Sequence, residues 1–416
     1  MDKIKTEILV IGGGASGLSA GISATRNGAK VIIVDREEKL GGILKQCIHN
    51  GFGLKYYKKE MTGPEYANNL IVEAKSLNIP ILMQTSVTKV TKMQNGSFKV
   101  KVVSPNGLKE IIAKAVILAM GCRERTAASI SLGGTRPVGV ISAGSAQKMI
   151  NVYGQMIGKN VVIVGSGDVG LIMARRLYFE GANVIGVYEI NSIPSGLNRN
   201  IVQCLNDYNI PLHLSETVVE VLGKDRVSGV VVAKVNPDFS FDLKTRRVIP
   251  CDTILLSVGL VPETDLVSND IVINKLTSGA VVDDNYQTST SGLFSCGNVL
   301  HVHDIVDDVT MESIDAGKCA ALFVKNKLTE GKKFKVLTGN LVRYSVPSYA
   351  EGGQGFLNVK FRVSGVKKDC FITARLADGT VIAKRPAKIV LPAQMEQVVI
   401  DKSKIVGDLT ISVEDN

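Results

Sequence analysis

The chain has 416 residues, of which 45% are hydrophobic and 21% charged, so it is long enough for two or three globular domains. Tryptophan is absent and aromatic residues make up only 5%, which argues against the stacking surfaces that bind nucleic acid. Seven scattered cysteines without a C-x-x-C pair indicate free thiols in a reducing cytoplasm. The net charge is +10, and residues 331–416 hold 14 Lys and Arg against 8 Asp and Glu.

Residues 8–25 carry no charge and could be mistaken for a membrane span or a leader peptide. Glycine and serine recur throughout this run, and Asp2 and Glu7 do not suit a cationic leader. A nucleotide-binding turn explains the same residues, so we expect no transmembrane segment and no targeting signal.

A glycine-rich turn with the spacing of a dinucleotide-binding site follows the apolar strand predicted at residues 7–11. Gly12 allows the tight turn, Gly14 lets a pyrophosphate approach the backbone, and Gly17 lets the following helix pack on the strand. The first amides of that helix supply hydrogen-bond donors and a partial positive charge to the phosphates.

The next apolar strand, residues 31–34, ends at Asp35. This acid comes 23 residues after Gly12, where a carboxylate can accept hydrogen bonds from a ribose hydroxyl. Three neighbouring residues are assigned to the same dinucleotide site: Ala15, Ser16 and Arg36.

A second complete unit begins 153 residues later, with a strand at 161–164, the turn Gly165-x-Gly167-x-x-Gly170 and a further strand that ends in Glu189. Two complete units predict a chain that binds two dinucleotides. Glu189 can bind the ribose diol of NAD and would repel the extra phosphate of NADP, so NAD is favoured. Two further residues of this turn are assigned to the site: Asp168 and Val169.

With these two units the chain resembles the FAD- and NAD(P)-dependent pyridine nucleotide-disulfide oxidoreductase family, over residues 5 to about 328. "VILAMG" (116–121) and "DTILLSVGLVPETDL" (252–266) resemble the segments at which the chain leaves and re-enters the FAD domain. "TSTSGLFSCGNVLHVHD" (288–304) resembles the second flavin motif, in which an acid contacts the ribityl chain. Asn298 replaces that acid here, and it can hydrogen-bond but brings no charge.

The resemblance implies an α/β fold with two Rossmann-like domains, the NAD domain being inserted in the FAD domain. The expected domains are 1–122 and 252–330 for FAD, 123–251 for NAD and 331–416 for a small C-terminal β-domain. A helix expected to begin near Thr310 would aim its N-terminus at the flavin and stabilise negative charge on the reduced ring. The resemblance assigns further residues to cofactor binding: Gly42, Ile43, Val87, Met120, Gly121, Gly259, Gly297, Asn298 and Thr310.

The disulfide reductases of this family carry two cysteines, separated by four residues, after a glycine pair beside the flavin. The matching positions here are Leu44 and His49, and neither is a cysteine. The C-x-x-C of thioredoxin reductases is missing from the NAD domain. The family's C-terminal histidine also has no counterpart, since the last histidine of the chain is His303. These three absences exclude dithiol chemistry.

Lys45, Cys47 and His49 remain as candidate catalytic residues beside the flavin ring. A functional interpretation makes Cys47 or His49 a proton donor, or makes Cys47 a single thiol that cycles through sulfenic acid as in NADH peroxidases. The structural alternative is that Cys47 is simply buried and His49 simply hydrogen-bonded. His301 and His303 in "HVHD" raise the question of a metal, but a third, distant ligand is missing, so no metal site is expected.

A closer resemblance rests on "GGILKQCIHNGFG", "TGPEYA", "GCRERT" and "CGNVLHVHDIVDDV". These segments are similar to FAD/NAD oxidoreductases that accompany flavin-dependent glycerol-3-phosphate dehydrogenase-like proteins. More distantly, "GCRERT" and "GVISAGSAQ" are similar to nucleotide-binding subunits of opine and proline dehydrogenases. Both resemblances imply an electron-transfer subunit with a protein partner, in a homo- or hetero-oligomer. Two alternatives stay open: a stand-alone NADH oxidase or peroxidase that uses Cys47, and a subunit that binds nucleotides without turnover.

Residues 331–416 read as five or six short strands with alternating apolar and polar residues and with turns at Asp378-Gly379, Pro386 and Pro392. This pattern predicts a small β-domain of the sandwich type. We favour a solvated basic surface as the explanation of the positive surplus over a docking face for an acidic partner. Because the domain holds most of that surplus, it is the place where a partner protein would dock; the alternative is a passive lid on the FAD domain.

Overall fold

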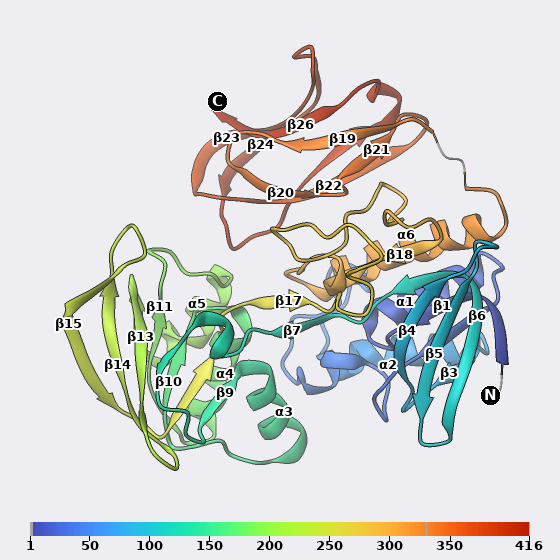
Figure 1. Cartoon of the computed structure of the whole chain (residues 1–416). Coiled ribbons are helices and arrows are strands. Elements are labelled where there is room, and N and C mark those ends of the chain that lie inside the picture. The colour runs from blue at the N-terminus through green and yellow to red at the C-terminus, as the bar shows by residue number, and fades with distance from the viewer. Residues whose placement is uncertain (1–2, 329–330, 416) are drawn as a thin grey trace. The chain divides into compact units, whose positions relative to one another are not determined.

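The structure is a computed structural model that describes residues 3–328 and 331–415 (Figure 1). The chain divides into two compact units, Met1–Cys122 with Val261–Asn416, and Arg123–Leu260. The division after residue 122 lies where the resemblance placed it. The chain re-enters the first unit after residue 260, and not after residue 251 as expected. The reason is that the strand Thr253–Leu256 pairs within the sheet of the inserted unit.

A mostly parallel sheet forms the centre of the first unit. Its strands are β1 (Lys3–Ile11), β2 (Val31–Val34), β3 (Ile81–Leu82), β4 (Ser86–Lys92), β5 (Phe98–Ser104), β6 (Gly107–Leu118) and β18 (Leu293–Ser295). They lie in the order β3-β2-β1-β6-β5-β4, with β18 pairing with β6. Val10 of β1 lies between Ile33 and Ile117 in parallel register, and all three are buried. Burial on both faces explains why β1 and β2 read as continuous apolar runs.

Helices α1 (Ala15–Arg26), α2 (Gly63–Ser76) and α6 (Val306–Val324) share one hydrophobic core with a face of this sheet. α1 and α6 pack closely at Gly317, where a Cβ would lie 2.2 Å from the carbonyl oxygen of Ala20. α2 begins with a capping box in which Thr62 and Glu65 exchange side-chain-to-backbone hydrogen bonds. The close contact at Gly317 holds the middle of α6 against α1.

The inserted unit contains a parallel sheet in the order β12-β11-β10-β16-β9 and a second sheet in the order β15-β14-β13-β8. The bounds of the first are β9 (Val140–Ser142), β10 (Asn160–Val164), β11 (Asn183–Glu189), β12 (Leu212–Leu214) and β16 (Thr253–Leu256). The second comprises β8 (Gly133–Gly134), β13 (Glu216–Gly223), β14 (Val227–Val235) and β15 (Phe241–Pro250). The helices are α3 (Ala143–Tyr153), α4 (Asp168–Phe179) and α5 (Asn198–Cys204). The central strand β10 is buried from Val161 to Val164 and leads directly into the second glycine turn.

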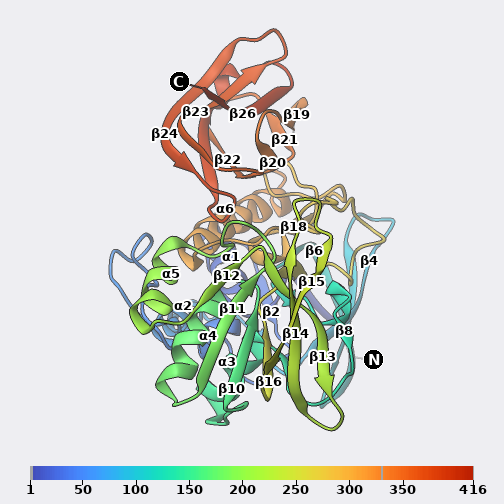
Figure 2. The ribbon, with the colours of Figure 1, turned by 90° about the vertical axis from the view of Figure 1, so that its left-hand side faces the viewer.

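Described residues 331–415 form eight strands in two sheets with a common apolar core, which Figure 2 shows from the side. One sheet is β21-β19-β26-β23-β24 and the other is β20-β22-β25. The bounds are β19 (Lys333–Thr338), β20 (Val342–Val346), β21 (Tyr349–Glu351), β22 (Phe356–Val363), β23 (Lys367–Leu376), β24 (Val381–Val390), β25 (Glu396–Asp401) and β26 (Leu409–Asp415). The expected β-sandwich is therefore present, with more strands than the five or six expected.

The turns of this domain differ from expectation at Pro386. The chain does turn at Asp378-Gly379, where Gly379 has φ +90°, and Pro392 follows the end of β24. Pro386 instead lies inside β24, opposite Phe371 of β23. Because β24 is the last strand of its sheet, the missing N–H of proline can face away from the ladder, so the expectation of a turn at Pro386 was wrong.

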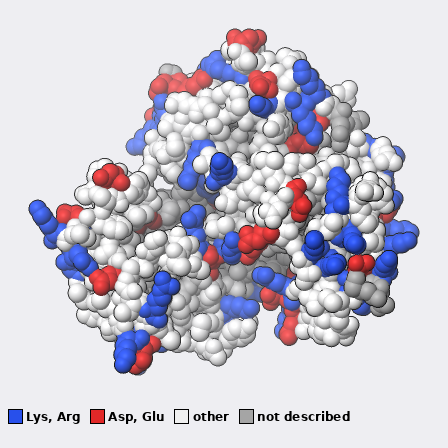
Figure 3. Space-filling view, in the orientation of Figure 1, with Lys and Arg blue, Asp and Glu red and all other residues white. Residues whose placement is uncertain are grey.

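None of the described helices is both long enough and apolar enough to cross a bilayer. The uncharged run at residues 8–25 is divided among the end of β1, the glycine turn and most of α1. On the face drawn in Figure 3, basic and acidic side chains are interspersed, so the positive surplus is not gathered into one patch on that face.

Candidate functional site

The turn between β1 and α1 has the geometry that its glycines predict. Gly12 adopts φ +113°, and a Cβ there would lie 2.3 Å from the carbonyl oxygen of Ala119. A Cβ at Gly17 would lie 1.7 Å from the carbonyl oxygen of Gly12, so helix and turn meet without room for a side chain. Gly14 is the N-cap of α1, and a Cβ there would meet only the Cα of Gly42, at 3.8 Å. The turn is therefore tight at its first and third glycines and open at the second.

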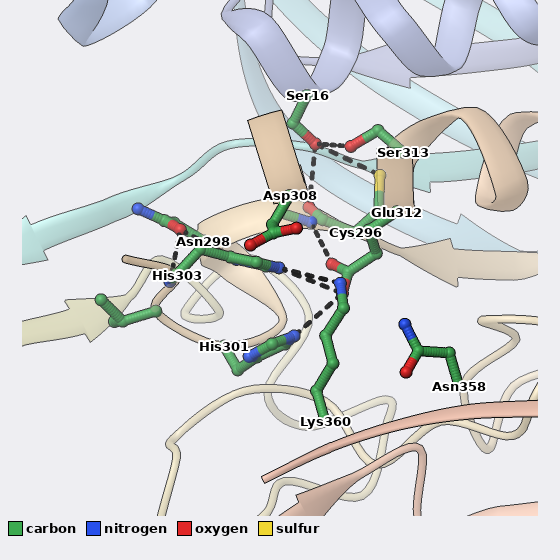
Figure 4. Close-up of polar contacts among 12 residues, drawn as sticks. Ser16, Cys296, Asn298, His301, His303, Asp308, Glu312, Ser313, Asn358 and Lys360 are labelled. Carbon is green, nitrogen blue, oxygen red and sulfur yellow. Dashed lines mark hydrogen bonds and ion pairs between the residues drawn. The ribbon is translucent and has the colours of Figure 1, made fainter. Parts of the chain in front are cut away.

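The start of α1 offers free donors to an anion. No described side chain caps this helix, and its first turn carries no acidic residue. The amides at Ala15 and Ser16 thus keep the positive end of the helix dipole open to a phosphate. The hydroxyl of Ser16 points elsewhere: it donates to the carbonyl oxygen of Cys296 at 3.1 Å and lies 2.8 Å from Ser313 Oγ (Figure 4). We therefore assign only the backbone of Ser16 to the pyrophosphate.

Asp35 is buried at the end of β2 and braces the glycine turn. Its carboxylate accepts hydrogen bonds from the amides of Gly13, at 2.6 Å, and Glu37, at 2.8 Å. A carboxylate has about four lone-pair directions, so Asp35 can still accept from a ribose hydroxyl. Arg36, which follows it, is exposed.

The other residues assigned to the first dinucleotide site occupy segments of the same unit. Gly42 has φ +55° and begins the 3₁₀ turn Gly42–Gln46, in which Ile43 is 61% exposed. Val87 lies in β4 opposite Val102. Met120 and Gly121 follow β6, and Gly121 has φ +75° with open space where a Cβ would point. This first unit therefore brings the proposed FAD residues into one domain, although they lie far apart in sequence.

The second flavin motif contains Gly297 and Asn298, which follow β18. Gly297 adopts φ +71°, and its amide donates to Glu312 Oε1 at 2.9 Å. Asn298 Oδ1 accepts two hydrogen bonds from His303, one from the backbone amide at 3.1 Å and one at ring Nδ1, 3.2 Å away. The amide nitrogen of Asn298 lies on the opposite side, 3.8 Å from Cys122 Sγ. Asn298 thus presents its N–H₂ group on the side away from His303, where it donates to Cys122 Sγ and has a second N–H.

Helix α6 begins at Val306, one turn earlier than expected. Thr310 is therefore inside the helix, fully buried, and accepts a hydrogen bond from Tyr66 Oη at 2.8 Å. The first turn carries Asp307 and Asp308, and Asp307 accepts from the amides of three residues, Gly53, Lys55 and Tyr56. These acids already offset the positive end of the helix dipole, so the expected stabilisation of a reduced flavin by this terminus is weakened.

The turn after β10 resembles the first turn in being tight at its first and third glycines, but its second glycine is not open. Gly165 has φ +84°, and a Cβ there would lie 2.3 Å from the carbonyl oxygen of Ser257. Cβ atoms at Gly167 and Gly170 would lie 2.8 Å and 2.4 Å from the side chain of Ser257. Ser257 Oγ accepts from the Gly170 amide at 3.1 Å and donates to the carbonyl oxygen of Gly167 at 3.2 Å. Ser257, which the sequence analysis missed, is therefore the residue on which the second turn closes.

Asp168 and Val169 form the first turn of α4, and Asp168 Oδ1 accepts from the Leu197 amide and from Asn200. Gly259, in the same unit, has φ +103° and accepts a hydrogen bond from the Arg125 amide. These three residues therefore brace the protein around the second turn.

Glu189 is placed at the end of β11, as expected, but its carboxylate is already occupied. Oε2 accepts from the amide and hydroxyl of Ser166 and from the hydroxyl of Ser195, while Oε1 accepts from the backbone and side chain of Asn191. These five donors use the lone pairs that a ribose diol would need. The expectation of a direct bond from Glu189 to the ribose is not supported, although the buried negative charge remains.

Lys45, Cys47 and His49 each contact a nearby backbone carbonyl. Lys45 Nζ donates to Lys39 O at 2.7 Å, Cys47 Sγ donates to Ile43 O at 3.3 Å, and His49 Nδ1 lies 2.9 Å from Asn50 O. Burial raises the pKa of the Cys47 thiol to about 12. Cys47 is therefore a protonated thiol at neutral pH, which favours the structural interpretation of this residue.

His301 and His303 converge on a residue that the sequence analysis missed. Their Nε2 atoms lie 2.9 Å and 3.1 Å from Glu312 Oε2, and the ligand atoms of all three residues lie within 4.8 Å of one another. The argument that no third distant ligand exists was therefore wrong, because α6 supplies Glu312. Lys360 Nζ, from β22, also lies 2.8 Å from the same oxygen (Figure 4). Glu312 thus already has a cation beside it.

Comparison with known proteins identifies relatives over the part of the chain that contains both glycine turns. The family model of pyridine nucleotide-disulphide oxidoreductases matches residues 6–321. Hydrogen cyanide synthase subunit HcnB from Pseudomonas protegens is 25% identical over 332 residues, which cover 76% of this chain and 67% of HcnB. One of the subunits of alkyl hydroperoxide reductase from Staphylococcus aureus is 25% identical over 322 residues, which cover 76% of this chain and 58% of that protein.

Solved structures support the same fold. Thioredoxin reductase from T. acidophilum matches 78% of this chain and 99% of its own, with a TM-score of 0.62 and 22% identity. L-proline dehydrogenase from P. horikoshii matches 79% of this chain and 59% of its own, with a TM-score of 0.53 and 17% identity. The paired glycine turns and the family match together define an FAD-dependent oxidoreductase that uses NAD(P)H: the chain belongs to the pyridine nucleotide-disulphide oxidoreductase family.

Proposed function

We propose that this protein transfers hydride between NAD(H) and FAD and exchanges the electrons with a second protein instead of a disulfide. The observation that carries this proposal is the segment after the first glycine turn. Its two disulfide positions are Leu44 and His49, and the remaining thiol, Cys47, has a pKa raised to about 12 by burial. An electron path through a dithiol therefore has no chemical basis in this segment.

The residues of the first unit would hold the flavin nucleotide. The open amides of α1 and the space at Gly14 suit a pyrophosphate, and Asp35 suits the ribose of the adenosine. Asn298 would meet the ribityl chain as a donor, since His303 uses its oxygen. FAD, when bound, supplies the chemistry of taking a hydride and releasing electrons. The protein contributes binding and orientation.

The second unit would hold the nicotinamide nucleotide, with NAD preferred to NADP. Glu189 keeps a buried negative charge at the end of β11. Its oxygens are saturated by Ser166, Ser195 and Asn191, so discrimination would come from repulsion of the extra phosphate of NADP and not from a bond to the ribose diol. The preference is therefore expected to be moderate.

The role of an electron-transfer subunit is supported by resemblance. HcnB is, by its name, one subunit of hydrogen cyanide synthase, and the similarity extends over 76% of this chain. The flavin-dependent glycerol-3-phosphate, opine or proline dehydrogenases implied by the sequence motifs are the class of partner that we propose. The electron donor or acceptor would then be bound by that partner.

Anaerobic titration tests this function. The protein is purified without oxygen, its flavin is released and identified, and the absorbance of the bound flavin is followed as NADH or NADPH is added. We expect bound FAD that is bleached faster by NADH than by NADPH. We also expect electron transfer to an artificial acceptor such as ferricyanide, but no NADH-dependent reduction of a small disulfide. Rapid reduction of the disulfide would refute the proposal, and a flavin that neither nucleotide bleaches would favour a non-catalytic subunit.

A further inference from the structure

Lys360 brings a buried positive charge from the C-terminal β-domain to the second flavin motif. It lies in β22, only 8% of the residue is exposed, and its Nζ is 2.8 Å from Glu312 Oε2. Glu312 is 2% exposed and belongs to α6. Burying two opposite charges in contact is favourable only if both stay paired and hydrogen-bonded.

Glu312 connects this charge to Gly297 and Asn298. One carboxylate oxygen accepts from the Gly297 amide at 2.9 Å, and the other lies 3.1 Å from His303 Nε2. His303 in turn holds the oxygen of Asn298 from two sides. The backbone N–H of His303 can only donate, so the atom that faces it is Oδ1. The N–H₂ group of Asn298 lies on the other side, where it donates to Cys122 Sγ at 3.8 Å and has a second N–H. Figure 4 shows these side chains converging from the loop, α6 and β22.

The protonation of the two histidines follows from their neighbours. Because Asn298 Oδ1 is an acceptor, His303 Nδ1 carries a proton. His303 Nε2 lies 3.1 Å from Glu312 Oε2 and 3.5 Å from Lys360 Nζ. Burial lowers the pKa of His301 to about 3, so His301 is neutral and donates from Nε2 to Glu312. Lys360 supplies an ammonium in direct contact with this carboxylate.

The balance of charge favours Lys360 over a metal ion as the partner of Glu312. A divalent cation held by His301, His303 and Glu312 would lie beside an ammonium that is already within 2.8 Å of the same carboxylate oxygen. Two cations against one carboxylate would leave an excess of positive charge in a buried site. One ammonium and one carboxylate leave none.

We propose that Lys360 is a positioning residue of the flavin site, which acts through Glu312 and His303 to fix Gly297 and the donor face of Asn298. This inference rests on the flavin site proposed above. It makes the C-terminal β-domain a functional part of that site, since Lys360 lies in β22 of that domain. Removing the ammonium leaves Glu312 as an unpaired buried charge, which disturbs the motif and adds negative potential around it.

The test compares Lys360→Met with Lys388→Met, a matched change of an exposed lysine on β24 of the same domain. Flavin content after gel filtration, FAD affinity and the midpoint potential of the bound flavin are measured for both. We expect Lys360→Met to weaken FAD binding by about tenfold or more. We also expect it to shift the flavin potential to more negative values, while Lys388→Met matches the wild type.

A double variant separates positioning from general damage to the fold. Glu312→Gln combined with Lys360→Met removes both charges and keeps an acceptor for the Gly297 amide. We expect the flavin potential and FAD affinity of the double variant to return toward the wild type, because no unpaired charge remains. A loss in the double variant as large as the sum of the single losses would refute the coupling.

Two other outcomes would overturn the proposal. The first is a Lys360→Met protein that binds FAD with the wild-type affinity and potential. The second is a stoichiometric metal ion in the purified wild type that is lost on changing His301 or His303 to alanine. A wild-type protein that binds no flavin at all would instead remove the proposed function itself.

Discussion

Tyr66 Oη donates a hydrogen bond to Thr310 Oγ1 at 2.8 Å, and both side chains are fully buried. This contact joins α2 to α6, the helix that carries Glu312. It also explains why Thr310 is not at a helix terminus: its hydroxyl is used inside the core.

The nearby Tyr57 differs from Tyr66 in the hydrogen bonding of its hydroxyl, and the pair therefore allows a matched test. Its ring packs edge-on against Tyr66 at 5.0 Å, but its buried Oη has no hydrogen-bond partner among the described residues. We expect Tyr66→Phe to reduce the free energy of unfolding by about 1 kcal/mol, and Tyr57→Phe to leave it unchanged or raise it. Chemical denaturation of the two variants checks this pair, and equal effects would contradict it.

The raised pKa of the half-buried Cys47 thiol leads to a prediction about reactivity. Because burial raises its pKa to about 12, the protonated form is the one that the fold stabilises. That stabilisation is complete below the pKa of the unfolded thiol and is lost as the pH rises through about 12. We expect iodoacetamide to label Cys47 slowly near neutral pH and rapidly once the chain is unfolded.

Peptide mass spectrometry at several pH values measures that labelling. A Cys47→Ser variant should keep the rate of flavin reduction by NADH, and its activity with peroxide should equal that of the wild type. Fast labelling of the folded protein at neutral pH, together with loss of peroxide reduction in the serine variant, would favour the NADH peroxidase alternative.

The local patterns of the sequence were enough to predict the two nucleotide turns. Gly12 and Gly165 do adopt positive φ angles, and each lies against the carbonyl of a following strand or loop, as a strand-turn-helix unit requires. The strand, glycines and terminal acid of each unit lie within about 35 residues of one another, so their spacing reveals the unit. The contacts of Gly12 with Ala119 and of Gly165 with Ser257 are long-range and could not be predicted from spacing. The alternating strands of the β-domain could also be predicted from local sequence, except that β19, β20 and β21 were not recognised as separate strands.

The residues that depend on long-range packing could not be predicted. Glu312 read as one acid of an ordinary helix, and Lys360 as the polar position of an alternating strand. Only the packing of β22 against the second flavin motif brings them together. α6 was expected to begin near Thr310 but begins at Val306. Its first turn carries Asp307, which accepts hydrogen bonds from three backbone amides around Lys55. The one signal in the sequence for the cluster of His301, His303 and Glu312 was the position of Glu312, an acid between the small residues Thr310 and Ser313.

Ser257 supports the second glycine turn, so we expect its substitution to weaken the binding of the nicotinamide nucleotide and to leave FAD binding unchanged. Its hydroxyl bonds the Gly170 amide and the Gly167 carbonyl, so Ser257→Ala removes both contacts. We expect the KM for NADH to rise by at least about fivefold, since two hydrogen bonds to the turn are lost, with flavin content unchanged. Steady-state kinetics with ferricyanide measures this, and Ser268→Ala, at an exposed serine, is the control. An unchanged KM would mean that NADH is bound elsewhere.

Gly12 and Gly165 allow the two nucleotide sites to be separated. An alanine Cβ at either position would lie 2.3 Å from a backbone carbonyl oxygen, and both residues have positive φ angles. We expect Gly12→Ala to lose most of its FAD. Gly165→Ala should keep its flavin but be reduced by NADH at least about tenfold more slowly, because its second turn cannot close.

Gly96 provides the control for these two variants. It also has a positive φ angle, +83°, but open space where a Cβ would point, so Gly96→Ala carries the backbone strain without the clash. We expect that variant to keep FAD and NADH reduction and to lose about 1 kcal/mol of stability. Absorbance spectra and anaerobic stopped-flow reduction compare the three proteins. If Gly165→Ala lost its flavin and Gly12→Ala kept it, the assignment of FAD to the first turn and the nicotinamide nucleotide to the second would have to be reversed.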